Sequence, residues 1–336
     1  MSVFGEWYGV ARRLGTPVIL ALGLAVGMVA CGGGTAQVQK FVPARLIVFG
    51  DENSLIVNDG ANNGKKYTVN GLDATLVRDC LLLPIWVQAV ASHYNLVFAE
   101  CNKAAASPLA FMRARVNATV EHPSLGMAAQ LAAQAAAGGA VKSGDLVLVM
   151  LGANDLYALA DRLKAGTITT AEASAESRRL ARVLAGHINN VLGAGARAIV
   201  STVHDVGLSP YAIAQEVANP GAKARLSALV LDFNGTLRTS IDSTRFDGRN
   251  YGLVLADDVS QSMSRNPAVF NLTNVVTGVC AIALPECTSA AADIITVNGV
   301  GANVAAYMWA DDRRVSPAVH ARIGEQATAR AAGNPF

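Results

Sequence analysis

One stretch limits the possible folds of this chain more than any other. Residues 145–151 consist of an aspartate and an unbroken apolar run, and Gly144 and Gly152 enclose them. The apolar residues do not alternate with polar ones, so a strand formed here would be buried on both faces, as in a parallel sheet. Further short apolar segments predict strands at 44–49, 95–98, 198–203 and 251–256.

Helical patterns lie between these predicted strands. They cover residues 84–92, 128–137, 156–164, 170–192, 222–240 and 316–331. Thr170 is the candidate N-cap of its helix, with Glu172 nearby. The polar segment 58–70, rich in Asn, Gly and Lys, predicts a surface loop. Strands separated by helices favour an α/β fold with a parallel sheet covered on both faces.

Length and charge narrow the classes of function. The 336 residues can bury the core of one large domain, and no second domain or internal repeat is evident. Lys and Arg total 27 against 25 Asp and Glu, without a basic run or a patch of interleaved aromatics, so we expect no nucleic-acid partner. We also expect neither a cofactor nor a metal ion, because no Cys-x-x-Cys or His pair has ligand spacing.

The first residues have the pattern of an export signal. Arg12 and Arg13 precede an apolar run over 17–30, which is short for a membrane span and ends in small residues before Cys31. This ending, followed by three glycines, resembles the lipobox of a bacterial lipoprotein, in which the cysteine is acylated. The alternative is an ordinary cleaved signal with an incidental cysteine.

The lipobox resemblance implies a domain organisation and a location. It gives a signal peptide over 1–31, a flexible tether over 32–43 and a folded domain over 44–336. The implied partner is a membrane, held through a lipid anchor at Cys31. Glycine directly after this cysteine favours the bacterial outer membrane, on its periplasmic side or at the cell surface.

Export also changes how the remaining cysteines are interpreted. Cys80, Cys101, Cys280 and Cys287 form an even set, and two disulfides are plausible in an oxidising compartment. Cys280 and Cys287 are the favoured pair, because the short loop between them can close and would stabilise the chain by about 2 to 4 kcal/mol. Metal ligation by all four cysteines is the less favoured alternative.

Three polar segments follow or flank the predicted strands. They are Gly50-Asp51-Glu52-Asn53-Ser54, Gly152-Ala153-Asn154-Asp155 and Asp311-Asp312-Arg313-Arg314. In this order they resemble the motifs of the SGNH or GDSL hydrolases, a family of esterases and lipases. The resemblance covers residues 44–331 and implies a flavodoxin-like α/β/α sandwich that hydrolyses carboxylic esters.

The family's site residues can be carried over one at a time. Asn154, in a Gly-x-Asn-Asp segment with Gly152, matches the asparagine of the oxyanion hole, and Asp311 matches the aspartate that orients the catalytic histidine. The nucleophilic serine is replaced by Glu52 and the histidine by Arg314. The segment Ala99-Glu100-Cys101-Asn102 stands where the family has a block with an oxyanion-hole glycine.

These replacements predict that Ser–His catalysis is impaired or lost. Arginine cannot act as a general base because its pKa stays above about 12. Loss of a triad member lowers turnover by about 10⁴ to 10⁶. We expect Glu52 and Arg314 to form a charge-assisted, bidentate hydrogen bond at the old catalytic position, with Asp311 joining the network.

Two residues could in principle substitute for the missing groups. Ser54 lies two positions after the nucleophile position, where a structural role in the turn is favoured. His320 lies six residues after Arg314 in the last predicted helix, and a structural histidine is at least as good an interpretation as a displaced base. The other histidines, which are His93, His122, His187 and His204, have no motif context.

Two functions therefore compete. The first is an ester hydrolase that retains the family's activity, with a shifted nucleophile. The second is a catalytically silent surface lipoprotein that keeps the cleft to bind an acyl or glycan ligand or a partner protein. A purely structural lipoprotein is a third reading.

Overall fold

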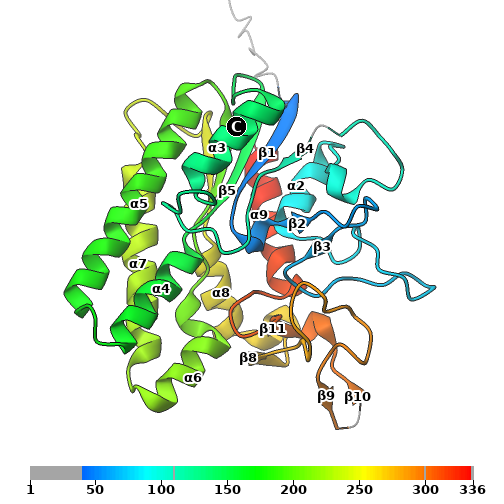
Figure 1. Cartoon of the computed structure of the whole chain (residues 1–336), viewed down its shortest axis with the longest axis vertical. Coiled ribbons are helices and arrows are strands. Elements are labelled where there is room, and N and C mark those ends of the chain that lie inside the picture. Colours follow the sequence, from blue (N-terminus) through cyan, green and yellow to red (C-terminus); the bar gives the residue numbers. More distant parts are fainter. Residues whose placement is uncertain (1–39, 109, 299, 334–336) are drawn as a thin grey trace, which may run out of the picture. The chain divides into compact units, whose positions relative to one another are not determined.

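The computed structural model describes residues 40–108, 110–298 and 300–333 (Figure 1). The predicted signal peptide, Cys31 and most of the tether lie outside these residues. Within the described part of the chain, no helix has the length and apolar character needed to cross a membrane.

A five-stranded parallel sheet forms the centre of the domain. Its strands are β1 (Arg45–Gly50), β4 (Ala110–Met112), β5 (Asp145–Met150), β6 (Arg197–Ser201) and β7 (Tyr251–Val254). They lie in the order β4-β1-β5-β6-β7, and every neighbouring pair is parallel. This is the 2-1-3-4-5 order of flavodoxin-like folds. The predicted α/β/α sandwich is therefore confirmed.

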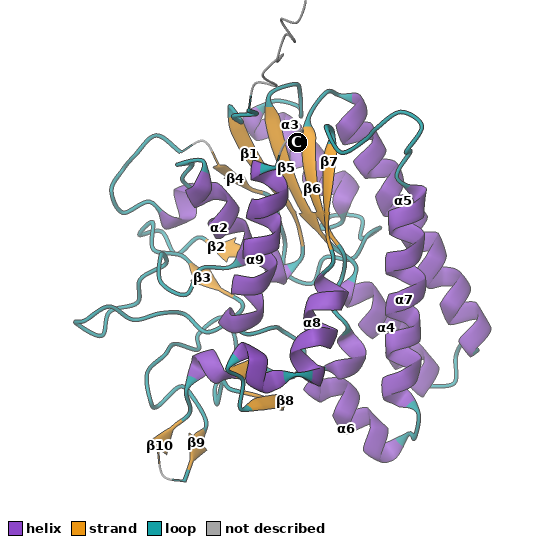
Figure 2. Ribbon diagram, turned by 180° about the vertical axis from the view of Figure 1, so that it is seen from behind, coloured by secondary structure: helices purple, strands orange, loops and turns teal. Residues whose placement is uncertain are grey.

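Helices cover both faces of the sheet (Figures 1 and 2). They are α2 (Trp86–His93), α3 (Met127–Gly138), α4 (Ala153–Lys164), α5 (Thr170–Gly193), α6 (Pro210–Ala218), α7 (Ala222–Ser240), α8 (Ala256–Arg265) and α9 (Pro317–Ala332). Short strands outside the central sheet form three pairs: β2 (Ile56–Val57) with β3 (Lys65–Lys66), β8 (Asn274–Gly278) with β11 (Tyr307–Trp309), and β9 (Thr296–Val297) with β10 (Val300–Gly301).

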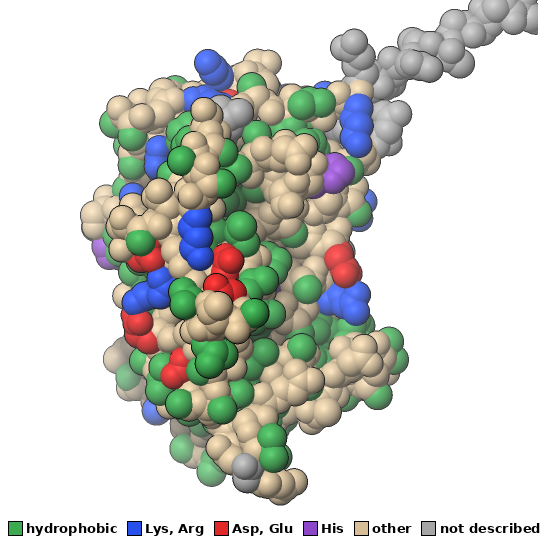
Figure 3. Space-filling model, turned by 90° about the vertical axis from the view of Figure 1, so that its right-hand side faces the viewer, with side chains coloured by type: hydrophobic (Ala, Val, Ile, Leu, Met, Phe, Trp, Pro, Cys, Tyr) green, Lys and Arg blue, Asp and Glu red, His purple; other side chains and the backbone are tan. Residues whose placement is uncertain are grey.

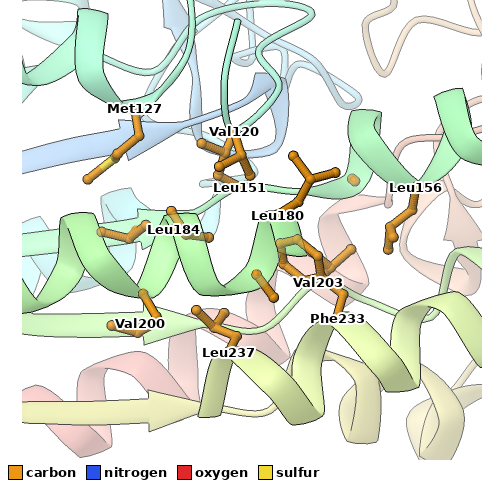
Figure 4. Close-up of a cluster of buried hydrophobic side chains, with 14 of the residues drawn as sticks. Val120, Met127, Leu151, Leu156, Leu180, Leu184, Val200, Val203, Phe233 and Leu237 are labelled. Carbon is orange, nitrogen blue, oxygen red and sulfur yellow. The ribbon is translucent and has the colours of Figure 1, made fainter. Parts of the chain in front are cut away.

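Strand β1 shows how the sheet separates two apolar cores. Ile47 and Phe49 belong to the cluster that includes residues of α4, α5 and α7. Leu46 and Val48 belong to the cluster that includes residues of α2, α8 and α9. Successive side chains of a strand point to opposite faces, so an unbroken apolar run serves both cores. Figure 4 shows part of the first cluster, where side chains of α5 and α7 face Val200 of β6.

Several local predictions were wrong. Residues 95–98 are not a strand: Asn95 has a left-handed backbone, φ 54°, directly after α2, and Phe98 forms only an isolated bridge. The second sheet strand is instead β4. Helices α6 and α8 were not predicted, and α4 begins at Ala153 rather than at residue 156. The N-cap of α5 is Thr169, whose hydroxyl accepts from the Glu172 backbone at 3.2 Å.

Segment 58–70 is only partly the surface loop that its polarity predicts. Lys66 and Asn70 are fully buried. The Lys66 ammonium donates to the backbone oxygens of Cys80, Leu82 and Leu83 at 3.0, 2.6 and 3.0 Å. Burial lowers the pKa of Lys66 to about 7, and the negative charge of Asp79 opposes that effect. A buried charge is tolerated here because its donors are matched by acceptors.

Two disulfides close loops outside the sheet. Cys280 and Cys287 are bonded, as predicted, with their Cα atoms 5.9 Å apart. Cys80 and Cys101 form the second bond, with a Cα separation of 5.6 Å. The two bonds use the four cysteines for which two disulfides were predicted.

Candidate functional site

The turn after β1 places Glu52 at the carboxyl edge of the sheet. Gly50 has φ +154°, and a Cβ there would lie 2.2 Å from the Met150 carbonyl oxygen, so glycine permits the close approach of β1 to β5. Asp51 caps the following turn, because its Oδ1 accepts from the Asn53 backbone at 2.9 Å. The edge between these two strands is where a flavodoxin-like fold reverses its strand order and binds ligands.

Four N–H groups surround the Glu52 carboxylate. Arg314 donates to Oε1 from Nε at 3.2 Å and from Nη2 at 2.9 Å. Oε2 accepts from the side-chain nitrogen of Asn154 at 2.9 Å and from the backbone nitrogen of Asn117 at 3.0 Å. The expected ion pair is confirmed, with both Arg314 donors meeting on one oxygen. Asn154 and Asn117 satisfy the other oxygen.

Asp311 completes the charge network. Its Oδ2 accepts from Nη1 of Arg314 at 3.1 Å, and its Oδ1 accepts from the Arg314 backbone at 2.6 Å. Burial lowers the pKa of Arg314, but the Asp311 and Glu52 carboxylates outweigh it and hold that pKa above its ordinary value. The Glu52 side chain is only 3% exposed and that of Arg314 21%. The site is thus a largely buried cluster of two carboxyl groups and one guanidinium.

The pKa of the neighbouring Asp51 is affected by burial and by the negative charge of Glu52. Its side chain is fully buried, and burial together with the Glu52 charge raises its pKa to about 7. A carboxyl group in such a position is held neutral in mildly acidic solution. The side-chain hydrogen bonds of Arg314 go to the other two carboxyl groups, those of Glu52 and Asp311.

The start of α4 positions Asn154. Gly152 precedes this helix with φ +130°, and a Cβ there would meet the Phe233 ring at 2.5 Å. Glycine is therefore required by the backbone conformation and by packing. Because the helix begins at Ala153, Asn154 falls in its first turn and reaches Glu52. Asp155, next along the helix, is buried and accepts from the Val120 backbone at 3.0 and 3.2 Å.

The hydrogen-bond donors to Glu52 among the described residues do not come from the segment Ala99-Glu100-Cys101-Asn102. Phe98 and Cys101 belong to a short 3₁₀ turn and its cap before β4, and Cys101 is used in a disulfide. The donor that reaches the site comes from Asn117, in the turn after β4. Asn117 has φ 58°, a left-handed conformation that asparagine tolerates well. Its contact is through a backbone N–H, so no side-chain motif identifies it.

Ser54 and His320 both lie inside the protein. Ser54 is fully buried, and its hydroxyl accepts from the Trp86 indole at 3.0 Å. His320 is 1% exposed, and neither ring nitrogen has a hydrogen-bond partner among the described residues. Ser54 therefore supports the turn, as favoured from the sequence. The structure brings Glu52, Asn154, Asp311 and Arg314 together without either residue.

No protein-family model matches the chain, and no curated protein matches it. The geometry by itself defines an α/β protein with a parallel sheet, compatible with the fold of the SGNH hydrolases. Its polar residues converge at the sheet's carboxyl edge on a carboxylate whose two oxygens are both occupied.

Two buried histidines make a contribution to stability that is lost in acid. Burial lowers the pKa of His320 to about 3 and that of His204 to about 4, and the charges of His204 and Lys66 add to the effect on His320. Unfolded imidazoles titrate near pH 6.5. The unfolded state then binds protons that the folded state does not. For each histidine this contribution to stability is retained above about pH 6.5 and lost toward pH 4, by up to about 1.4 kcal/mol per pH unit. Asp51 and Asp155, whose pKa values burial raises to about 7, have the opposite effect over the same range, so the histidine contribution is measured as a difference between variants.

We expect His320→Leu to lose part of this dependence. Its free energy of unfolding, measured by urea titration at several values between pH 4.5 and 7.5, should rise relative to wild type as the pH falls. The exposed His93 supplies the control: His93→Gln should keep the wild-type dependence. Parallel pH profiles for His320→Leu and wild type would contradict the prediction.

Proposed function

We propose that the chain is a bacterial outer-membrane lipoprotein with an SGNH/GDSL-type hydrolase fold, that it has lost Ser–His catalysis and that it acts by binding. The observation that carries the proposal is the Glu52 carboxylate at the nucleophile position, held by four donors at 2.9 to 3.2 Å. Its ligand would be an acyl or glycan group or a partner protein.

The chemistry of the site argues against ester hydrolysis. A serine hydrolase needs a nucleophile activated by a base, and free donors for the oxyanion that forms on the substrate. Arg314 cannot accept a proton. The donors at Asn154 and Asn117 already bind Glu52, so a substrate oxygen would have to displace a buried, charge-paired carboxylate. Both requirements fail at the same place.

A groove beside the site supports binding. It has a volume of about 430 Å³, lies between α6 and β8, and reaches Asp311 and Asp312. Ile213 and Val217 of α6 and Val276 of β8 supply apolar walls. Walls of this kind suit an acyl chain, which would lie next to the charge cluster without entering it.

The test compares wild type with Glu52→Ser/Arg314→His, using short p-nitrophenyl esters and a fluorophosphonate probe. Wild type should show neither turnover above the buffer rate nor labelling. The double variant should be labelled at position 52, because Asp311, Asn154 and Asn117 are already placed for it.

Glu52→Gln/Arg314→Gln is the matched control, since it also removes both charges but supplies neither nucleophile nor base. Robust wild-type turnover with the probe attached to Ser54 would refute the silent assignment. A folded double variant that remains unlabelled would show that more of the catalytic machinery is missing than two side chains.

A further inference from the structure

A loop beside the disulfide exposes an unusual number of large apolar side chains. Residues 72–83, which we call the leucine loop, project from the domain next to β2 and β3 (Figure 1). Its four exposed apolar residues are Leu76 at 78% exposure, Val77 at 54%, Leu81 at 66% and Leu82 at 40%. The face of the molecule that includes this side carries scattered charges among many apolar side chains (Figure 3).

Hydrogen bonds and a disulfide attach the leucine loop to the rest of the domain. The Lys66 ammonium binds three of the backbone oxygens at its C-terminal end, and the Cys80–Cys101 disulfide ties it to the neighbouring turn. The Asn63 side chain donates to the Arg78 carbonyl at 2.6 Å and accepts from the Cys80 backbone at 2.8 Å. The loop thus presents its apolar side chains on an ordered backbone.

Each charged side chain of the loop has a hydrogen-bond or ion-pair partner. Asp73 accepts from the backbones of Thr75 and Val77 at 2.8 and 3.0 Å. Arg78 pairs with Asp59 at 2.5 Å, and Asp79 lies 3.9 Å from Lys103. Arg78 and Asp79 thus have oppositely charged partners. Asp73 has no salt-bridge partner among the described residues, and hydrogen bonds from Thr75 and Val77 satisfy its carboxylate.

An apolar hollow continues the patch beside the leucine loop. Its volume is about 300 Å³, and Leu81 shares it with Leu96, Phe98 and Ala91. Exposed apolar surface that is continuous and held rigid marks a site of contact with a partner or a membrane.

The chain outside the described residues indicates which of the two it is. The predicted lipid site, Cys31, is separated from Lys40, the first described residue, by a tether of eight residues. At 3.3 to 3.6 Å per residue, even a fully extended tether holds Lys40 within about 30 Å of the lipid. A bilayer is then always close to the domain, at a far higher effective concentration than any diffusing partner.

We propose that the leucine loop enters the interface of the membrane that carries the lipid anchor, and so gives the domain a second membrane contact. The inference rests on the lipoprotein assignment made above. Leucine and valine side chains placed among the acyl chains lose their exposed apolar surface, and the strength of such binding scales with that surface.

The experiment uses the full chain, produced in a bacterium that acylates lipoproteins, on phosphatidylcholine vesicles with and without brominated acyl chains, which quench tryptophan fluorescence on contact. Leu76→Trp reports on the loop. Leu231→Trp is the matched control, because Leu231 is 68% exposed and lies on α7, outside the loop and the groove. Wild type supplies the background from the native tryptophans, of which Trp86 and Trp309 are fully buried.

Brominated lipid should lower the added fluorescence of Leu76→Trp by about half and leave that of Leu231→Trp unchanged. Equal quenching at both positions, or none at either while the chain sediments with the vesicles, would overturn the membrane contact; the latter result would assign the loop to a protein partner. Failure of wild type to sediment with the vesicles would refute the lipoprotein assignment and the loop contact together.

Discussion

Arg314→Ala is expected to lower the free energy of unfolding by about 3 to 5 kcal/mol. Breaking a buried ion pair by removing one partner leaves the other charge uncompensated, and costs of this size follow. Here the remaining charge is the Glu52 carboxylate, whose side chain is 3% exposed and cannot recover its lost partner from water. Urea unfolding at neutral pH measures the loss.

An exposed arginine provides the control. Arg322 pairs with Glu325 three residues later on α9, with side-chain exposures of 41% and 64%. Surface pairs of this kind contribute about 0 to 1 kcal/mol, so Arg322→Ala should change stability little. In Glu52→Gln/Arg314→Gln the stability should recover above that of Arg314→Ala, because the buried Glu52 charge is gone and only Asp311, whose side chain is 21% exposed, loses its cationic partner. A loss below about 1 kcal/mol for Arg314→Ala would contradict a stabilising role for the buried Glu52–Arg314 ion pair.

Glu52→Ala is expected to lose about 2 to 4 kcal/mol and to become responsive to formate. Arg314 keeps its partner Asp311 at 3.1 Å, so this loss is smaller than that of Arg314→Ala. The substitution vacates the space of one carboxylate and leaves four N–H donors around it. A small carboxylate that binds there stabilises the folded state by RT ln(1 + [L]/Kd), about 1.4 kcal/mol when formate is tenfold above Kd.

Thermal unfolding in 100 mM formate against 100 mM chloride measures this rescue. The melting temperature of Glu52→Ala should rise by a few degrees in formate. Wild type should not respond, since its own carboxylate fills the space, and Glu52→Ala/Asn154→Ala should respond less because one donor is gone. An equal rise in wild type would show a general salt effect instead.

Much of the fold and of the charge cluster could be predicted from the sequence. The continuous apolar run of β5 requires burial on both faces, which a parallel sheet under two helical layers provides. Glu52, Asn154 and Arg314 could be associated because each follows a recognisable segment at the carboxyl edge of the sheet. Prediction worked where side-chain identity determines the outcome.

The failures have a common physical origin. β4 has only three residues, too few for a periodic signal, and the contact from Asn117 depends on a backbone N–H set by a left-handed φ. Lys66 is expected at the surface from the sequence, because it is charged and lies in a polar segment. Its acceptors come from carbonyls fourteen to seventeen residues further along the chain, and only the folded backbone brings them together.

Arg314 and Glu52 differ in how many oppositely charged partners they have, and this difference affects the order in which the two residues can be replaced. Arg314 has a second acid and some access to solvent, whereas Arg314 is the one cationic partner of Glu52 within the described part of the chain. A lineage that replaces the glutamate first passes through a weakened but folded intermediate, and one that replaces the arginine first passes through a much less stable one. On a path from this site to a Ser–His pair, replacement of Glu52 is therefore expected before replacement of Arg314. On the reverse path, the glutamate is expected to appear after the arginine.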